Sequence, residues 1–344
     1  HPEVVDTREG RAMLDGFIFN GCACERDWKP SDMIAEIREN TLLAIGDERA
    51  ILGFSGGVDS TTGSAILSPV LGERLRGFCL DLGQFRLNEL DEVRLHAKAA
   101  GIPLEVLSEP SRLQRIFCDT QPAGVEIAEW KRKCFSVVYG EAFAEYARTV
   151  GAKCVIQLSL ATDFIESGKA GASALIKSHH NTIADFGELK PLHPFRHLFK
   201  YEVRELAKAL SLPPSVVNRQ PFPGPGLLVR FVGGIPTLEN LALVRFADAR
   251  AREVLTATGE YDKISQLVVA VPALRITGVK GDGRAYRYPV LIRAVESSDF
   301  MTARGYRFPS ETQEKLEQAL TAHREIVAVS YWPTSKPPQT VEFE

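Results

Sequence analysis

Residues 55–60 read Ser-Gly-Gly-Val-Asp-Ser, directly after the apolar run Ile51-Leu52-Gly53-Phe54 and directly before the helix-prone stretch 61–67. A buried strand, a glycine-rich turn and a helix start together predict a nest of backbone N–H groups at the positive end of a helix dipole. Such a nest binds an anion, and its two glycines let the backbone approach that anion closely. The stretch therefore predicts a phosphate-binding turn in an α/β fold, with an ordinary glycine-rich turn as the alternative.

The polar side chains of this loop make the prediction more specific. Ser55 and Ser60 add hydroxyl donors, whereas the carboxylate of Asp59 would repel a phosphate unless a divalent cation lay between them, which implies Mg²⁺. The Gly-Lys-Ser/Thr ending of a Walker A loop is absent. The pattern instead resembles the pyrophosphate loop of the N-type ATP pyrophosphatases, which cleave ATP between the α- and β-phosphates. This resemblance implies that ATP is bound by Ser55, Gly56, Gly57, Val58, Asp59 and Ser60, with Mg²⁺ on Asp59.

Length and composition are those of a two-domain enzyme. The chain has 344 residues, of which 44% are hydrophobic, enough to bury a full core. A net charge of −3 gives no overall attraction to nucleic acid, and no apolar run or signal peptide predicts a membrane or secreted protein. Six cysteines without a C-x-x-C pair indicate free thiols. We therefore expect a cytoplasmic protein with neither a nucleic-acid nor a membrane partner.

Apolar runs and helix-prone stretches alternate between residues 29 and 219. Helices between short apolar runs predict a doubly wound, mainly parallel sheet, which binds ligands at the carboxyl ends of its strands. Prolines at 213–214 and 221–225 predict a boundary, after which the pattern favours a smaller α+β domain over residues 220–344. The predicted strands are 50–54, 75–81, 103–107, 153–158, 266–271, 288–294, 326–331 and 340–343. The predicted helices are 60–70, 88–100, 126–149, 200–211, 239–255 and 310–324.

Further motifs make the resemblance specific to one family. In order and spacing they resemble the GMP synthetases, in particular their ATP pyrophosphatase domain and C-terminal dimerisation domain, from about residue 28 to the end. The motifs are Arg86-Leu87-Asn88-Glu89, Lys131-Arg132-Lys133, 163–167, 177–181, Pro221-Phe222-Pro223-Gly224-Pro225-Gly226-Leu227, 281–284, 293–297, 299–303, Lys336-Pro337-Pro338 and Val341-Glu342-Phe343-Glu344. The resemblance implies a homodimer.

The first 28 residues carry a separate signal. His1-Pro2-Glu3-Val4 followed by Arg8-x-Gly10 resembles the tail of a class I glutamine amidotransferase, whose triad includes such a His and Glu. The cysteine nucleophile of that triad is not present in the sequence as given. Both a trimmed fragment and a natural chain without a glutaminase remain open. In either case we expect the chain to use free ammonia or a separate glutaminase.

The family resemblance implies a reaction and a set of site residues. XMP is adenylated by ATP at its C2 carbonyl and then aminated by ammonia, giving GMP, AMP and pyrophosphate, so the protein's work is alignment and charge stabilisation. Asp59, Lys177 and Ser60 are the implied catalytic residues. The residues implied to bind XMP or a related purine nucleotide are Arg86, Pro223, Gly224, Pro225, Asp282, Arg284, Lys336 and Glu342.

Each assignment has a plainer alternative. Arg86 and the run 131–133 also fit solvated surface charges. His179 and His180 are adjacent in sequence, so the two rings point apart on a helix or strand and do not favour a metal site. Taken alone, Gly281-Asp282-Gly283-Arg284 predicts a hairpin turn, and Lys336-Pro337-Pro338 predicts an extended linker.

Departures from the family pattern leave other functions open. Gln157-Leu158-Ser159 replaces Gln-Gly-Thr, so Leu158 is expected to crowd the nucleotide, and 182–186 replaces a glycine-rich hinge. One alternative is a paralogue that activates another purine nucleotide for a different nucleophile such as sulfur, with Cys118 or Cys134 as the candidate thiolate. Another is a non-catalytic, nucleotide-binding regulatory subunit, against which the presence of Asp59 and Lys177 argues.

Overall fold

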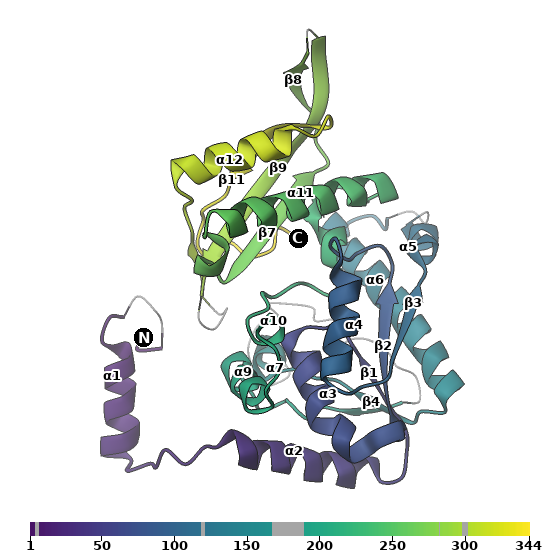
Figure 1. Ribbon diagram of the computed structural model, residues 1–344, viewed down its shortest axis with the longest axis vertical. Helices are drawn as coiled ribbons and strands as arrows, with labels where there is room; N and C mark the ends of the chain where they lie inside the picture. The colour runs from purple at the N-terminus through teal and green to yellow at the C-terminus, as the bar shows by residue number, and fades with distance from the viewer. Residues whose placement is uncertain (4–6, 118–120, 167–188, 282, 298–301) are drawn as a thin grey trace.

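The computed structural model describes the chain except for residues 4–6, 118–120, 167–188, 282 and 298–301 (Figure 1). Two sheets, each accompanied by helices, form two lobes that lie one above the other in Figure 1. The first sheet belongs to the N-terminal half of the chain and the second to the C-terminal half. Lys177 and Asp282 are therefore among the predicted site residues that lie outside the described residues.

The first sheet has five parallel strands in the order β3-β2-β1-β4-β5. Adjacent residues of a strand face opposite sides, so Ile51 of β1 packs in one hydrophobic core and Leu52 in the other, both fully buried. A strand buried on both faces must be apolar throughout, which explains the continuous run at 50–54. The strands are β1 (Ala50–Gly53), β2 (Leu75–Asp81), β3 (Leu104–Ser108), β4 (Cys154–Ile156) and β5 (Lys190–Leu192).

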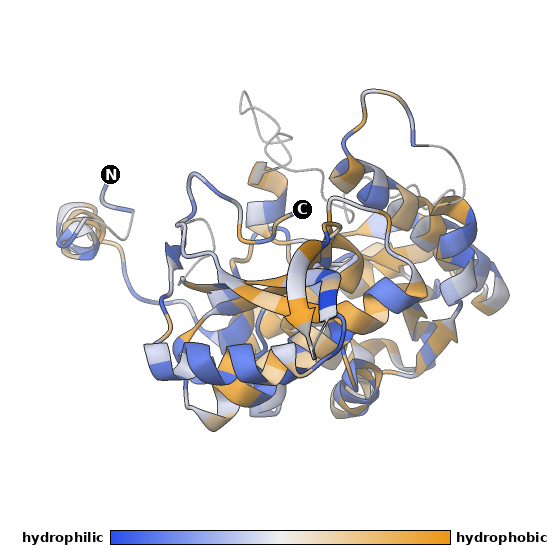
Figure 2. Ribbon diagram, turned by 90° about the horizontal axis from the view of Figure 1, so that it is seen from above, coloured by the Kyte–Doolittle hydropathy of each residue, from blue (hydrophilic) through white to orange (hydrophobic). Residues whose placement is uncertain are grey.

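Helices cover both faces of this sheet, which makes the fold a doubly wound α/β domain. Buried side chains of α2, α3, α4 and α9 join Leu52 on one face, and those of α5 and α6 join Ile51 on the other. Figure 2 shows the strands in orange and many outward helix surfaces in blue. The helices are α2 (Pro30–Ile45), α3 (Val58–Leu71), α4 (Glu89–Ala99), α5 (Pro110–Phe117), α6 (Ile127–Val150), α7 (Ala161–Glu166), α9 (Lys200–Ala209) and α10 (Pro214–Val217).

The second sheet is mixed and centres on the long strand β9 (Gly283–Glu296). Its order is β10-β9-β7-β6; β8 pairs antiparallel and β11 parallel with β9. The other strands are β6 (Phe231–Val232), β7 (Gln266–Pro272), β8 (Ile276–Lys280), β10 (Arg304–Gly305) and β11 (Ile326–Tyr331). Helices α11 (Leu238–Ala257) and α12 (Ser310–Thr321) pack on it. Their buried residues belong to the same hydrophobic core as α6, so one core continues from the first sheet into the second.

The N-terminal segment lies apart from both sheets in Figures 1 and 2. Helix α1 (Gly10–Asp15) continues into a π-helical turn at Gly16–Gly21, and Met13 and Phe17 are exposed. The imidazole Nδ1 of His1 lies 2.8 Å from Glu3 Oε1, with both side chains exposed. No helix among the described residues is both long enough and apolar enough to cross a lipid bilayer.

The predicted elements are largely confirmed, and the errors have physical reasons. The sequence patterns do not predict helices α2, α5, α7 and α10 or the strands β5, β6, β8 and β10. The shortest of these elements have little periodicity to detect. The predicted strand 340–343 is wrong: these residues, all described, form no strand. Instead, the Val341 carbonyl accepts a hydrogen bond from the buried guanidinium of Arg293 (Nε to O, 3.1 Å).

Candidate functional site

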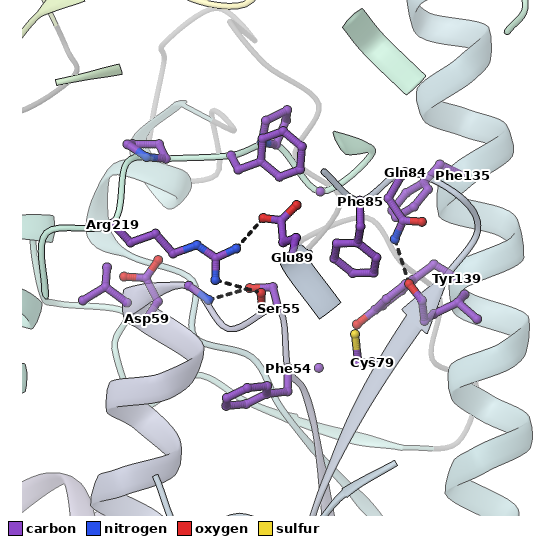
Figure 3. A pocket seen from close by; sticks show the side chains of 18 of the residues that line it. Phe54, Ser55, Asp59, Cys79, Gln84, Phe85, Glu89, Phe135, Tyr139 and Arg219 are labelled. Atoms are coloured by element: carbon purple, nitrogen blue, oxygen red, sulfur yellow. Dashed lines mark hydrogen bonds and ion pairs between the residues drawn. The ribbon is translucent and has the colours of Figure 1, made fainter. Parts of the chain in front are cut away.

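A cavity of about 360 Å³ opens at the carboxyl ends of β1 and β2. The loop between β1 and α3 forms one side, and residues 219–224, which precede the second sheet, form another. Figure 3 shows a polar end with Ser55, Asp59 and Arg219, and an end with Cys79, Phe135 and Tyr139. Its lining includes Gly53, Phe54, Ser55, Gly57, Val58, Asp59, Phe78, Cys79, Leu80, Gln84, Phe85, Glu89, Phe135, Ser136, Tyr139, Asp163, Lys200, Arg219, Gln220, Pro221, Phe222, Pro223 and Gly224.

The loop has the conformation expected of an anion nest. Gly56 has a left-handed backbone (φ +68°), and Gly57 is the residue before the first turn of α3. The hydroxyl of Ser55 accepts a hydrogen bond from Gly57 N–H (3.3 Å) and lies 3.3 Å from the hydroxyl of Ser60. Among the described residues no side chain caps this end of α3. The first backbone N–H groups of the helix, which lack helical partners, are therefore available to an anion.

Asp59 lies in the first turn of α3 and faces a lysine. Its Oδ2 accepts a hydrogen bond from Lys200 Nζ at 2.5 Å, while Oδ1 is buried without a partner among the described atoms. Lys200 is the first residue of α9, so the pair joins two helices at the mouth of the cavity. A carboxylate with one unused oxygen, beside an anion nest, fits a magnesium ion that shares phosphate oxygens. The described residues contain no cluster of three or more His, Cys, Asp or Glu side chains that would hold a metal alone.

Three buried charges support the polar end of the cavity. Glu89, at the start of α4, accepts hydrogen bonds from Arg86 Nη2 (2.9 Å), Arg86 N–H (2.9 Å) and Arg219 Nη2. Burial alone would raise the pKa of Glu89, but the charges and hydrogen bonds of the two arginines outweigh it and lower the pKa to about 2. The cluster therefore carries a net positive charge near the loop.

The other end of the cavity is mostly apolar. Tyr139 of α6 places its hydroxyl so close to Gly53 that a Cβ there would lie 2.3 Å from it. Burial, with added repulsion from Asp81 and Glu89, raises the pKa of the Cys79 thiol to about 12, so this sulfur stays protonated and is a poor nucleophile. Cys134, one candidate for a sulfur route, is buried in the core, and Cys118 lies outside the described residues.

The structure brings only part of the predicted nucleotide site to this cavity. Pro223 and Gly224 line it, and Pro225 follows directly in the chain. Arg86 is 7% exposed and paired with Glu89, and its guanidinium stacks 4.2 Å from the ring centroid of Phe222. Arg86 thus contacts the cavity wall through Phe222 rather than lining it.

Three described candidates farther along the chain, Arg284, Lys336 and Glu342, do not line the cavity. Arg284 is exposed at the start of β9, in the hairpin with β8 at the top of Figure 1. Glu342 accepts hydrogen bonds from Arg230 (Nη2, 3.1 Å) and Gln266 (Nε2, 2.8 Å), both buried. The backbone of Lys336 pairs with that of Ala303. Their assignment to a nucleotide stays a prediction.

Two sequence interpretations change. Lys131 is fully buried, and its ammonium donates to Phe231 O (2.6 Å) and to the carboxylate of Glu344, so it is not a surface charge. Leu158 does not line the cavity; it packs on α3, where a Cβ on Gly63 would lie 2.5 Å from its Cδ1. His179-His180 and segment 182–186 lie outside the described residues.

Sequence reasoning missed several residues that line the cavity. Among the described residues that line the cavity, Lys200 and Arg219 carry the positive charges, Phe222 forms a wall, and Asp163 also lines it. Phe222 and Asp163 belong to recognised motifs, which was a usable signal. Lys200 and Arg219 are distant from the loop in sequence, and only the packing of α9 and α10 brings them close.

The fold and the loop at the cavity place the chain in the class of PP-loop α/β proteins. Comparisons with known proteins then identify its family within that class. Residues 253–343 match the family "GMP synthase C terminal domain". All of the chain aligns with "GMP synthase [glutamine-hydrolyzing]" from Nitrosococcus oceani (40% identity, 66% of that protein) and from Aquifex aeolicus (37% identity, 67% of that protein). The chain thus spans about two thirds of the length of these relatives.

A solved structure of NMN synthetase from Francisella tularensis is also similar, with 15% identity and a TM-score of 0.46 over 62% of this chain and 85% of that one. Similarity this weak indicates nothing about substrate or reaction. The sequence relatives decide the family: the chain belongs to the GMP synthases.

Proposed function

We propose that this protein adenylates the C2 carbonyl of XMP with ATP and then aminates it with ammonia, giving GMP, AMP and pyrophosphate. Similarity to GMP synthases over the whole of this chain, which is about two thirds of their length, supports this reaction. The observation that carries it is the anion nest of 55–60, which shares one cavity with Lys200, Arg219 and the wall formed by Phe222. The loop, the cations and the wall come from distant parts of the chain and meet in this cavity.

The polar end of the cavity suits the phosphates of ATP. The free N–H groups at the start of α3, the hydroxyls of Ser55 and Ser60 and the ammonium of Lys200 are the donors there. They would bind the β- and γ-phosphates and stabilise charge on the leaving pyrophosphate. We also propose that Lys177, an implied catalytic residue, helps to neutralise charge on these phosphates.

Magnesium fits the same end. Asp59 would hold the ion through its unpartnered Oδ1, together with phosphate oxygens of ATP. When bound, Mg²⁺ would supply charge neutralisation on the phosphates. Lys200, which neutralises Asp59 in the present arrangement, would then be able to turn toward the phosphates.

The chemistry requires alignment rather than covalent help. The C2 oxygen of XMP attacks the α-phosphorus, the bond to the bridging oxygen breaks, and pyrophosphate leaves. Ammonia then attacks C2, AMP departs with the former carbonyl oxygen, and a proton is lost to solvent. The chain's part is to hold the oxygen and phosphorus in line and to exclude water. Phe222, whose ring contacts the guanidinium groups of Arg86 and Arg230, would provide a wall for this.

The proposal also covers the domains, the oligomeric state, the location and the nitrogen donor. We infer an ATP pyrophosphatase domain at 29–219, a C-terminal α+β domain at 220–344 that forms a homodimer, and a cytoplasmic location. Ammonia, free or from a separate glutaminase, is the proposed nitrogen donor.

A pyrophosphate-release assay tests the function. With ATP, Mg²⁺ and ammonium we expect release with XMP and none with GMP or IMP, and product analysis should find GMP and AMP. Asp59→Ala should reduce kcat/KM roughly 100-fold or more, because it removes the proposed metal carboxylate. Asp91→Ala, which removes an exposed carboxylate on α4, is the matched control. Release with a different purine nucleotide, or binding without release, would contradict the proposal.

A further inference from the structure

The carbonyl oxygen of Gly56, in the loop, accepts hydrogen bonds from two side chains. His96 Nδ1 lies 2.8 Å from it, and Arg219 Nη1 also donates to it. A carbonyl only accepts, so Nδ1 carries the proton, and His96 Nε2 accepts from the hydroxyl of Ser215 at 3.1 Å. Burial of His96, which is 3% exposed, lowers its pKa and favours this neutral form.

These bonds determine which way the loop peptide faces. In a trans peptide the C=O and N–H groups point in opposite directions. With the Gly56 carbonyl directed toward α4 and Arg219, the Gly57 N–H points the other way, toward Ser55 Oγ. Gly57 lines the cavity and Gly56 does not. A rotated peptide would present a carbonyl oxygen to the phosphate and remove a donor from the nest.

His96 gives the Gly56 carbonyl a second donor besides the arginine. The guanidinium of Arg219 is shared with Glu89, so its position depends on the charge cluster. His96 lies on α4, the helix that also carries Glu89, and its far side is held by Ser215 of α10. Val93, one helical turn earlier on α4, packs against Gly56. A Cβ on Gly56 would lie 3.0 Å from the Cα of Val93.

We propose that His96, oriented by Ser215, is a positioning residue that holds the Gly56–Gly57 peptide in its anion-binding orientation. The inference rests on the proposed function, since it assigns the loop to the pyrophosphate portion of ATP. His96 touches neither reacting atom; it acts through the loop backbone. Its loss therefore affects phosphate binding and leaves recognition of the acceptor nucleotide unchanged.

The test compares wild type with His96→Leu and His96→Asn. Calorimetry with inorganic pyrophosphate and Mg²⁺ gives the affinity of the loop, and initial rates give KM for ATP and for XMP separately. We expect His96→Leu to weaken pyrophosphate binding and to raise KM for ATP roughly tenfold, because a buried carbonyl loses a donor. The KM for XMP should stay within about twofold. His96→Asn retains an N–H near the position of Nδ1 and should recover most of the affinity.

The controls separate this role from a loss of helix stability. Lys98→Leu introduces the same residue on the exposed face of α4 and should leave both KM values unchanged. Equal rises in the two KM values, or wild-type pyrophosphate affinity in His96→Leu, would overturn the inference.

A second variant keeps the inference testable if His96→Leu does not fold. Ser215→Ala removes only the outer partner of the imidazole and should weaken pyrophosphate binding about twofold to threefold. Unchanged affinity in Ser215→Ala would then overturn it. If wild type itself binds no pyrophosphate, the proposed function fails first, which distinguishes the two failures.

Discussion

Asp59 and Gly56 illustrate how single residues of the loop set the character of the site. A carboxylate beside a phosphate cradle is unfavourable unless a cation neutralises it, and Lys200 does so at 2.5 Å. Gly56 is required for a different reason. Its backbone lies in the left-handed region, with a φ of +68°, and the space where a Cβ would project is filled by Arg219 and Val93.

Substitution of Gly56 should show both effects. The left-handed backbone costs a residue with a Cβ about 1–2 kcal/mol, and the close contacts add to this. We expect Gly56→Ala to lower the free energy of unfolding by more than Gly101→Ala, because Gly101 has a similar φ of +67° but open space around it. Urea unfolding of the two variants is the measurement. Equal losses would mean that the loop adjusts around the methyl group.

One face of α4 serves the loop at the scale of a whole element. Glu89, Val93 and His96 are all buried and lie four and three residues apart, which puts them on the same side of the helix. Glu89 binds the two arginines, Val93 packs against Gly56, and His96 binds the Gly56 carbonyl. The helix thus acts as a rigid support for the nest.

The pH dependence of stability should report on Glu89. The pKa of its carboxyl falls from the ordinary 4.5 to about 2. A depression of this size corresponds to roughly 3 kcal/mol of stabilisation when the group is ionised. Because the folded-state pKa is depressed, this stabilisation is complete above the ordinary pKa of 4.5 and is lost as the pH falls toward 2.

Glu89→Gln removes that titration. The difference in unfolding free energy between wild type and this variant should be largest at neutral pH and should shrink as the pH falls from about 5 to 2. Denaturant unfolding across that range measures it. Glu92→Gln, an exposed change on the same helix, is the control. A difference that is constant with pH would show that Glu89 is not the titrating group.

The two lobes of the molecule are joined by a shared core and by buried charges of the C-terminal residues. Lys131 of α6 is fully buried and binds the carboxylate of Glu344, the last residue of the chain. Burial lowers the pKa of Lys131, and the charge of Glu344 opposes this. Arg230 and Glu342 form a second pair nearby. The chain end is thereby attached to a helix of the first sheet.

A double-mutant cycle should detect the first of these pairs. Glu344→Gln alone leaves a buried ammonium without its counter-charge and should cost about 3 kcal/mol. Combined with Lys131→Met, the loss should be smaller than the two single losses added, by roughly 1–3 kcal/mol. Urea unfolding is the measurement. Lys208 and Glu205, an exposed pair, serve as the control and should show a much weaker coupling, on the order of 0.5 kcal/mol or less. Additivity at Lys131 and Glu344 would exclude a coupled pair.

Local patterns were sufficient for the loop, the strand–helix alternation and the parallel sheet. Ile51–Phe54 and Ser55–Ser60 predict a strand, a nest and a helix start because each depends on neighbouring residues only. The family motifs likewise predicted kinship with the GMP synthases, which the comparisons confirm.

Tertiary packing decided which side chains meet. Lys200, Arg219 and His96 reach the loop because helices far apart in sequence pack on one face of the sheet, and no local pattern encodes that proximity. Burial decided the roles of Arg86 and Lys131, since a basic residue becomes a structural ion only when a carboxylate from elsewhere is buried with it. The physical reason is the same in each case: hydrogen-bonding pattern and periodicity act along the chain, whereas charge pairing and desolvation act through space.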